Sequence, residues 1–466
     1  IRLDGSDQKS HLKVTGKKVP GQDKPLNASL VLRSPDKDQA LAKVNNDLYL
    51  AKVPYVGGTV PTVSVAGGKK APFPFTKLTD IGGQFPVWST DGKKIHWSIG
   101  NAFFTYDVER AKIHADSLQL LQKGITPSDT LTQTPYAPNE LQIQVKIDRD
   151  IPKGDILLKG ARIITMNGNE VIENGEVLIK NNRIVHVGAI GSSTAPNGTE
   201  IIDVSGKTIL PGFVDTHAHL RNDRGIHRTN NWSYLANLAY GVTTTRDPQT
   251  STTDVLTYED QVRSGKLIGP RIYSTGPGVF YSEVIKDQEH ARNVLKRYSK
   301  YYDTKTIKMY VAGNRQQRQW IITAAREQQL MPTTEGSLNF KLNMTQVIDG
   351  YPGHEHSFPI FPLYRDVVQL VAESRTVYTP TLLVAYGGPW AENYFYATEV
   401  VHDDPKLSYW TPHRDLDQKS RRRGSSRGGS GWFMDEEHVF KRQSAFVKDL
   451  IDAGGRAGVG SHGQLQ

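Results

Sequence analysis

Two histidines one residue apart follow an apolar segment in the stretch ILPGFVDTHAHL, residues 209–220. Alternate side chains of an extended strand point the same way, so His217 and His219 can bind one metal ion together. Such a pair alone is weak evidence, because histidine pairs of this kind also occur by chance on surfaces. Its position at the end of a buried strand, where barrel enzymes carry their reactive groups, favours a metal site.

Four further residues that can bind metal or move protons lie on predicted strands or at their ends. They are Lys308 in TIKMY, Glu335 in PTTEGS, His356 in GYPGHEHSF and His462 in GVGSHG. The chain has no cysteine, so a metal must be held by histidine, carboxylate or a modified lysine. Lys308 qualifies only as a carbamate, formed when CO2 adds to its amine. The alternative is a lysine in a buried salt bridge, which is costly unless the charge is paired.

Weaker candidates lie close to the same strand ends. His354 is either a substrate-facing residue or a structural histidine, and Arg246, Asp247 and Tyr310 are either substrate contacts or partners in rim salt bridges and the core.

Strands and helices alternate from residue 207 onward. Eight strand candidates occur, and each except the last is followed by a helix. This pattern predicts an α/β fold in which residues 207–466 form a (β/α)8 barrel, truncated after strand 8, whose reactive groups gather at the carboxyl ends of the strands. Residues 386–436 are too long for an ordinary loop of such a barrel, and we expect an active-site cover or an insertion there.

The residues before the barrel have an all-β pattern. Residues 146–206 alternate apolar and polar positions around NG and NN turns, which predicts a small β-sandwich domain. Residues 1–145 contain short strands with almost no helical periodicity, and two similar units lie some fifty residues apart. This repetition predicts a partial β-propeller of two blades, which cannot close by themselves, so the chain is expected to be part of a longer protein. A small β-domain of another kind is the alternative.

Two motifs resemble known families. KTILPGFVDTHAHL, preceded by IIDVSG, resembles the amidohydrolase superfamily, in particular its imidazolonepropionase-like and prolidase-like hydrolases, and this resemblance covers about residues 154–466. RSPDKDQALA and WSTDGKKIHW resemble blades of TolB-type β-propellers. The first resemblance implies a metal-dependent hydrolase with metal ligands at His217, His219, a carboxylated Lys308 and His356.

Two strands depart from the superfamily pattern. Its members usually carry His on the fifth strand and Asp on the eighth, whereas this chain has Glu335 and His462 there. The exchange is reciprocal, so we expect both residues to face the metals and one of them to act as the catalytic acid or base. The competing interpretation is a degenerate site without activity.

These observations predict a metal-dependent hydrolase that cleaves C–N bonds in amides, cyclic amides or peptide-like substrates with metal-activated water. One or two zinc ions are the default for histidine and carboxylate ligands, and iron, manganese or cobalt fit the same donors. The alternative function is a catalytically inactive propeller and barrel protein that acts as a binding or scaffold module.

Composition limits the partners. No apolar run approaches the roughly 18 residues of a membrane span, so no membrane partner is expected. Much of the net charge of +9 lies in KSRRRGSSRGG, residues 419–429, which has no aromatic platform beside it, so we expect a solvated loop and no nucleic acid. The expected partner is a small-molecule or peptide-like substrate, and a homo-oligomer is a candidate assembly. No signal peptide is visible, and without an initiator Met the periplasm and the cytoplasm both stay open.

Overall fold

The computed structural model describes residues 6, 10–67, 71–123, 135–220, 222–310, 312–384, 386–420 and 433–462. It divides into two compact units. The first unit comprises Ile1–Val145, Thr275–Gly336 and Lys341–His354, and the second comprises Lys146–Ser274, Ser337–Phe340 and Glu355–Gln466. The domain boundaries expected from the sequence stay a prediction.

The N-terminal part of the first unit consists of three sheets. A three-stranded sheet has the order β2-β1-β6, and two four-stranded antiparallel sheets have the orders β3-β4-β5-β7 and β11-β10-β9-β8. The strands are β1 (Lys13–Lys18), β2 (Pro25–Asn27), β3 (Leu30–Arg33), β4 (Gln39–Val44), β5 (Asp47–Lys52), β6 (Thr62–Ser64), β7 (Phe75–Lys77), β8 (Gln84–Trp88), β9 (Lys94–Ile99), β10 (Ala102–Asp107) and β11 (Asn139–Gln142).

Short turns join the central strands of both four-stranded sheets. Asn45 has a φ of 53° between β4 and β5, and Gly100 has a φ of 52° between β9 and β10. Positive φ values are what tight hairpin turns require, which explains asparagine and glycine at these positions. Each sheet has the strand number of a propeller blade, but the sheets of the described residues are open, and a TolB-type propeller is not shown.

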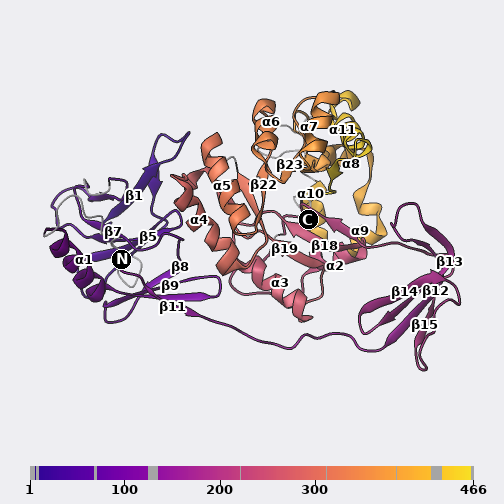
Figure 1. Ribbon diagram of the computed structural model, residues 1–466, viewed down its shortest axis with the longest axis horizontal. Coiled ribbons are helices and arrows are strands. Elements are labelled where there is room, and N and C mark those ends of the chain that lie inside the picture. Colours follow the sequence, from indigo (N-terminus) through magenta and orange to yellow (C-terminus); the bar gives the residue numbers. More distant parts are fainter. Residues whose placement is uncertain are drawn as a thin grey trace. The chain divides into compact units, whose positions relative to one another are not determined.

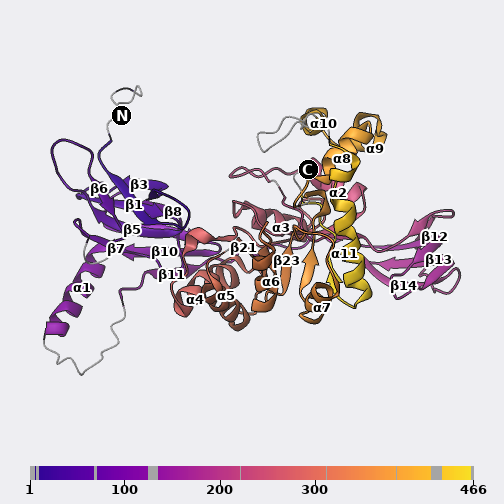
Figure 2. The same cartoon turned by 90° about the horizontal axis from the view of Figure 1, so that it is seen from above.

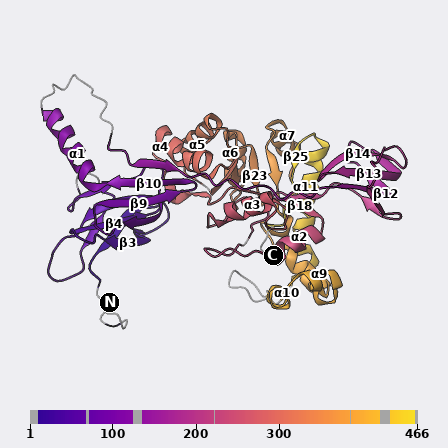
Figure 3. The same ribbon diagram turned by 90° about the horizontal axis from the view of Figure 1, so that it is seen from below.

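One helix was not expected from the sequence. Helix α1 (Val108–Lys123) follows β10 directly, as Figure 3 shows. Ile113 and Leu120 on this helix are 64% and 70% exposed, whereas Ala111 is buried. Few of the apolar residues of this helix share one buried face, so its sequence has only a weak 3.6-residue pattern. The near absence of helical periodicity in this region therefore did not exclude a helix.

The rest of the first unit alternates strands and helices. Strands β20, β21 and β22 pair in parallel, with Lys308 of β21 opposite Thr333 of β22. Helices α4 and α5 pack against each other beside them (Figure 1). The elements are β20 (Val279–Phe280), the 3-10 turn η2 (Tyr281–Glu283), α4 (Gln288–Lys296), the π-helical turn η3 (Arg297–Tyr302), β21 (Thr306–Tyr310), α5 (Arg315–Glu327), β22 (Met331–Glu335) and α6 (Phe340–Asp349), of which Phe340 is assigned to the second unit.

A small sheet opens the second unit. Strands β14, β13 and β12 are antiparallel, while β15 and β16 run parallel to β12. The described residues form one five-stranded sheet here, and the expected β-sandwich stays a prediction. Ala161, Ile163 and Val177 form its buried core. The strands are β12 (Asp155–Ile164), β13 (Val171–Lys180), β14 (Arg183–Ala189), β15 (Glu200–Asp203) and β16 (Thr208–Ile209), of which the first four are labelled in Figure 1.

The remainder of the second unit is again α/β. Strands β17, β18 and β19 are parallel neighbours, and β24 is parallel to β25. Helices α7 and α11 pack side by side, which Figure 2 shows. The elements are β17 (Phe213–Asp215), α2 (Trp232–Ala239), β18 (Val242–Asp247), α3 (Asp254–Ser264), β19 (Arg271–Ser274), β23 (Gly353–Glu355, of which Glu355 is in this unit), α7 (Arg365–Glu373), β24 (Val377–Thr379), η4 (Leu382–Val384), α8 (Ala391–Thr398), η5 (Val401–Asp403), α9 (Pro405–Trp410), α10 (His413–Ser420), η7 (Asp435–Glu437), α11 (Phe440–Asp452) and β25 (Arg456–Ala457).

The structure confirms the α/β class but not the closed barrel. All eight strand candidates are strands, from Phe213–Asp215 to Arg456–Ala457. The sheets that the described residues form are open, so the (β/α)8 barrel stays a prediction.

Two composition-based expectations concern particular segments. Within the described ranges, no helix combines the length and the apolar character that crossing a bilayer requires. The arginine-rich run, including Arg421 and Arg423, lies outside the described residues.

Candidate metal centre

Four of the predicted site residues meet in the second unit. His217 and His219 follow β17, His356 follows β23 and His462 follows β25. The ring of His462 lies 4.9 Å from that of His217 and 4.6 Å from that of His219, and the ring of His356 lies 4.9 Å from those of both His217 and His462, between centroids. Residues more than 240 positions apart therefore form one compact cluster of imidazoles.

The segment between the first two histidines anchors them in the core. Ala218 and Leu220, which alternate with the histidines, are buried in one hydrophobic cluster with Tyr234 and Tyr258. The apolar residues of THAHL therefore bind the segment to the protein interior, while the intervening histidines meet the other imidazoles.

The Nε2 atoms of His217 and His219 face each other at 3.0 Å. The Nδ1 atom of His217 lies 2.7 Å from Oε2 of Glu355, and that of His219 lies 2.9 Å from the carbonyl oxygen of Gln249. Both partners accept hydrogen bonds, so each Nδ1 carries the proton and each neutral ring turns a lone pair toward the other. Two facing lone pairs repel, and a proton or a metal cation between them removes the repulsion.

Glu355 is a further candidate residue of this site, which the sequence did not single out. Its side chain is 1% exposed, and its second oxygen lies 2.7 Å from Nη1 of Arg246. One buried carboxylate thus holds the ring of His217 and is itself neutralised by an arginine, an arrangement that orients metal-binding histidines in many proteins. The signal in the sequence was the position of Glu355 between two histidines in HEH.

A second carboxylate joins the first strand to the loop that carries His462. Oδ1 of Asp215 accepts hydrogen bonds from the backbone N–H groups of His217, at 3.0 Å, and Ser461, at 3.1 Å. The hydroxyl of Ser461 donates to Oδ2 at 2.5 Å. A Cβ atom on Gly460 would lie 2.7 Å from Cβ of His217, so only glycine allows the loop to approach this closely.

The backbone at the cluster is held in an uncommon conformation. His219, His356 and His462 have φ values of 45°, 70° and 70°, and Thr381, whose hydroxyl lies 2.6 Å from Nδ1 of His356, has a φ of 43°. Positive φ outside glycine costs of the order of 1–3 kcal/mol and is concentrated at functional sites. Packing and hydrogen bonds around the cluster therefore maintain a geometry that the backbone alone does not favour.

Three of the four histidines fit a divalent metal. Donor nitrogens of His217, His219 and His462 all lie within 4.8 Å of one another. Tetrahedral zinc with Zn–N bonds of about 2.0–2.1 Å separates its nitrogen ligands by about 3.3 Å, close to the 3.0 Å between the first two Nε2 atoms. Three imidazoles that surround one point also match the donor preference of zinc, iron and related metals.

Lys308 and Glu335 meet in the first unit. Nζ of Lys308 lies 2.7 Å from Oε2 of Glu335, and the lysine side chain is 0% exposed. The amine also lies 5.0 Å from the ring centre of Tyr310. This contact is the salt bridge that the sequence left open as the alternative to a carbamate. A carbamate at Lys308 would place a second anion beside an ionised Glu335. The metal-ligand roles of both residues stay predictions.

The weaker candidates have mainly structural contacts. Arg246 forms the ion pair with Glu355, and Asp247 accepts a hydrogen bond from the backbone of Gln249 at 3.1 Å, which orients the carbonyl that receives His219. His354 is buried in the first unit.

The chain is similar to deaminases over a short segment. It is 42% identical over 66 residues to a 5-methylthioadenosine/S-adenosylhomocysteine deaminase of Desulforamulus reducens, which is 14% of this chain and 15% of that protein. It is 34% identical over 83 residues to an adenine deaminase of Listeria innocua, 18% of this chain and 13% of that protein. The matches thus span less than a fifth of these relatives, and they support the resemblance to the amidohydrolase superfamily.

Solved structures and family models were compared as well. A crystal structure of a Xaa-Pro dipeptidase with bound methionine in the active site has a TM-score of 0.47 and 15% identity, covering 66% of this chain and 79% of that one. No protein-family model matches the chain.

Proposed function

We propose that the protein is a metal-dependent hydrolase that cleaves C–N bonds in amide, cyclic amide or amidine-like substrates. The observation that carries the proposal is the pair of Nε2 atoms of His217 and His219, facing each other at 3.0 Å with their Nδ1 protons held elsewhere. The similarity to deaminases, which are named for the cleavage of a C–N bond, supports the same reaction class.

In this proposal His217, His219 and His462 hold the metal. A bound divalent metal supplies a Lewis acid and lowers the pKa of water toward neutrality. Glu355 keeps the Nδ1 proton on His217, so that Nε2 stays available as a donor, and Arg246 keeps Glu355 ionised through their contact at 2.7 Å. His356, whose Nδ1 is engaged with Thr381, presents its Nε2 edge as a further ligand or as a proton carrier.

The roles proposed for Lys308 and Glu335 depend on whether the lysine is an ammonium or a carbamate. As an ammonium, Lys308 neutralises Glu335 and leaves that carboxylate as a hydrogen-bond acceptor for an incoming nucleophile or leaving group. As a carbamate, Lys308 becomes an oxygen ligand and must part from an ionised Glu335. The ion pair at 2.7 Å favours the ammonium, and carbamate carbon observed by NMR after incubation with labelled bicarbonate would favour the other role.

The test combines metal content with turnover. The purified chain is analysed for bound metals, stripped with a chelator and reconstituted with zinc, iron, manganese or cobalt. Hydrolysis is then assayed on a panel of aminopurine nucleosides, hydantoins, N-acylated amino acids and Xaa-Pro dipeptides. We expect metal-dependent turnover of at least one class that is lost in His217→Ala.

The inactive scaffold is the competing outcome. Metal binding without turnover of any class on the panel would favour it, and absence of stoichiometric metal together with unchanged behaviour of His217→Ala would refute the metal centre itself.

A further inference from the structure

A pocket in the first unit has the chemistry of an anion-binding site. Its volume is about 250 Å³, and strands β1, β5 and β7 line it together with the segment from Ser282 to His290. The volume lies below the roughly 300–1,000 Å³ that is usual for drug-sized ligands, so the pocket suits a smaller molecule.

Three lysines border this pocket, and two of them are uncompensated. Nζ of Lys77 lies 2.9 Å from Oδ2 of Asp47, so these two charges cancel. Lys17 and Lys286 form no ion pair with any residue of the described ranges. Partial burial lowers the pKa of Lys286, and the nearby charges of Lys77 and Lys17 lower it further, outweighing the opposite effect of Asp47 and Asp287.

The carboxylates of the pocket offset this excess only in part. Glu283 is paired with Arg297 at 3.1 Å and accepts a hydrogen bond from Asn46 at 2.7 Å. Asp287 next to Lys286 caps helix α4, with its Oδ1 atom 2.7 Å from the backbone nitrogen of His290. Among the lining residues, three lysines stand against the two carboxylates Asp47 and Glu283, so the pocket has an excess of one positive charge. Burial lowers the pKa of His290, which disfavours a further charge there.

The other walls supply an apolar body and one neutral donor. Leu26, Val44 and Phe75 line the pocket. The phenol of Tyr49, at the same pocket, has its pKa raised to about 12 by burial and the nearby Asp47, so it stays protonated and can donate a hydrogen bond. Cations at one part and apolar side chains at another fit a molecule with an anionic head and a small apolar body.

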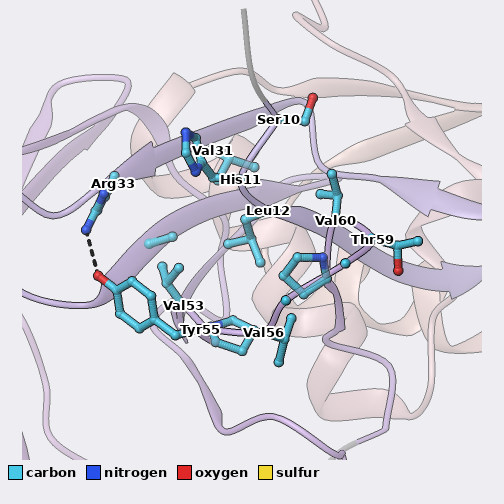
Figure 4. A pocket seen from close by; sticks show the side chains of 15 residues that line it. Ser10, His11, Leu12, Val31, Arg33, Val53, Tyr55, Val56, Thr59 and Val60 are labelled. Carbon is cyan, nitrogen blue, oxygen red and sulfur yellow. Dashed lines mark hydrogen bonds between the residues drawn. The ribbon is translucent and has the colours of Figure 1, made fainter.

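A larger pocket of the same unit shows the contrast. It has a volume of about 660 Å³ and is lined mainly by Val31, Val53, Val56, Val60 and neighbouring prolines and glycines (Figure 4). Its arginine, Arg33, is engaged with Tyr55 at 3.1 Å and with Asp38 at 3.5 Å. Because its cation is compensated, this pocket carries no comparable preference for anions.

We propose that the pocket bordered by Lys17, Lys77 and Lys286 binds a small organic anion, with a phosphate or carboxylate head at the lysines and an apolar group against Val44 and Phe75. This site is separate from the proposed hydrolase function, and its test does not depend on turnover.

The experiment uses phenyl phosphate as the probe and benzyl alcohol as its uncharged counterpart, titrated into the full chain by calorimetry. The variant Lys17→Gln/Lys286→Gln removes the two uncompensated charges. The control variant Lys18→Gln/Lys296→Gln removes the same charge from exposed neighbours on β1 and α4 that do not line the pocket.

We expect phenyl phosphate to bind the wild type and the control variant equally, and the pocket variant about tenfold or more weakly, since charge-assisted hydrogen bonds are lost. Benzyl alcohol should bind weakly to all three. Acetylation followed by mass spectrometry should show that phenyl phosphate protects Lys286 and Lys17 but not Lys18.

Three results would overturn the proposal. They are an absence of phenyl phosphate binding to the wild type, equal affinity for the wild type and the pocket variant, and an equal loss of affinity in the control variant, which would indicate a general charge effect.

Discussion

The histidine cluster and the pair of Lys308 and Glu335 were both expected to bind metal, yet the two regions are built differently. In the cluster, Glu355 and the carbonyl of Gln249 accept hydrogen bonds from Nδ1 of His217 and His219, and the two Nε2 atoms are directed at each other. In the pair, the lysine amine meets a carboxylate at 2.7 Å, and the two charges cancel. Residue type alone therefore does not decide whether a side chain can bind a metal. Its hydrogen-bond or ion-pair partner decides whether the donor atom keeps an available lone pair.

The largest effect should come from removing one imidazole. His217→Ala or His219→Ala should weaken metal binding by more than about 100-fold and abolish turnover, since the loss of a direct ligand exceeds the 10–100-fold effect of an outer partner. Metal content after dialysis and competition with a chelator measure this. His402→Ala, at an exposed histidine of the same unit, serves as the control and should change neither quantity.

If Lys308 and Glu335 form an ion pair, substituting Lys308 should lower the stability of the fold and leave metal affinity unchanged. Lys308→Met leaves Glu335 without its buried cation and should lower the free energy of unfolding by about 3 kcal/mol, measured by urea denaturation. Lys308→Met/Glu335→Leu should recover a large part of that loss. A loss of bound metal in Lys308→Met equal to that in His217→Ala would instead favour the carbamate role.

The predicted exchange of roles between strands is tested by Glu335→Gln and His462→Asn. We expect His462→Asn to reduce metal content, because His462 stands within the three-histidine group, and Glu335→Gln to reduce turnover with metal retained. If both variants kept metal content and turnover, the assignment of these two residues would be wrong.

A smaller effect is expected at Glu355, which touches only the far side of the His217 ring. Glu355→Gln keeps the shape but changes the hydrogen bond at Nδ1, so metal affinity should fall by about 10–100-fold. Asp254→Asn, at the partly buried ion pair with His227 outside the cluster, is the matched control and should leave metal affinity unchanged.

The smallest effect should be the acid response of the first unit. Burial raises the pKa of Glu283, but Arg297 and Asn46 outweigh it and hold the pKa below its usual 4.5. A lowered folded-state pKa means that the carboxylate stabilises the fold above about pH 4.5 and that this contribution is lost as the pH falls further. Between pH 7 and pH 3 the urea midpoint should therefore fall less steeply in Glu283→Gln than in the wild type.

Metal should leave the histidine cluster at a higher pH than the one at which Glu283 titrates, because protons compete with the metal for the imidazole nitrogens.

Much of this organisation could be predicted from local patterns. The eight strand candidates after residue 207 are all strands, because their short apolar runs and flanking helices are local signals. His217 and His219 could be paired from spacing alone. Helix α1 was missed because its apolar side chains are largely exposed, so its sequence lacks the period of an amphipathic helix.

The sequence by itself determined which residues have metal-binding side chains and that His217 and His219 lie close together, since strand geometry relates residues two apart. Only the tertiary structure decided that His462 and His356 join them, that Glu355 and the carbonyl of Gln249 accept the hydrogen bonds from Nδ1, and that Lys308 meets Glu335. The physical reason is that hydrogen-bond partners distant in the chain set the tautomer of a histidine and the charge state of a lysine. These distant contacts arise only when the chain is folded.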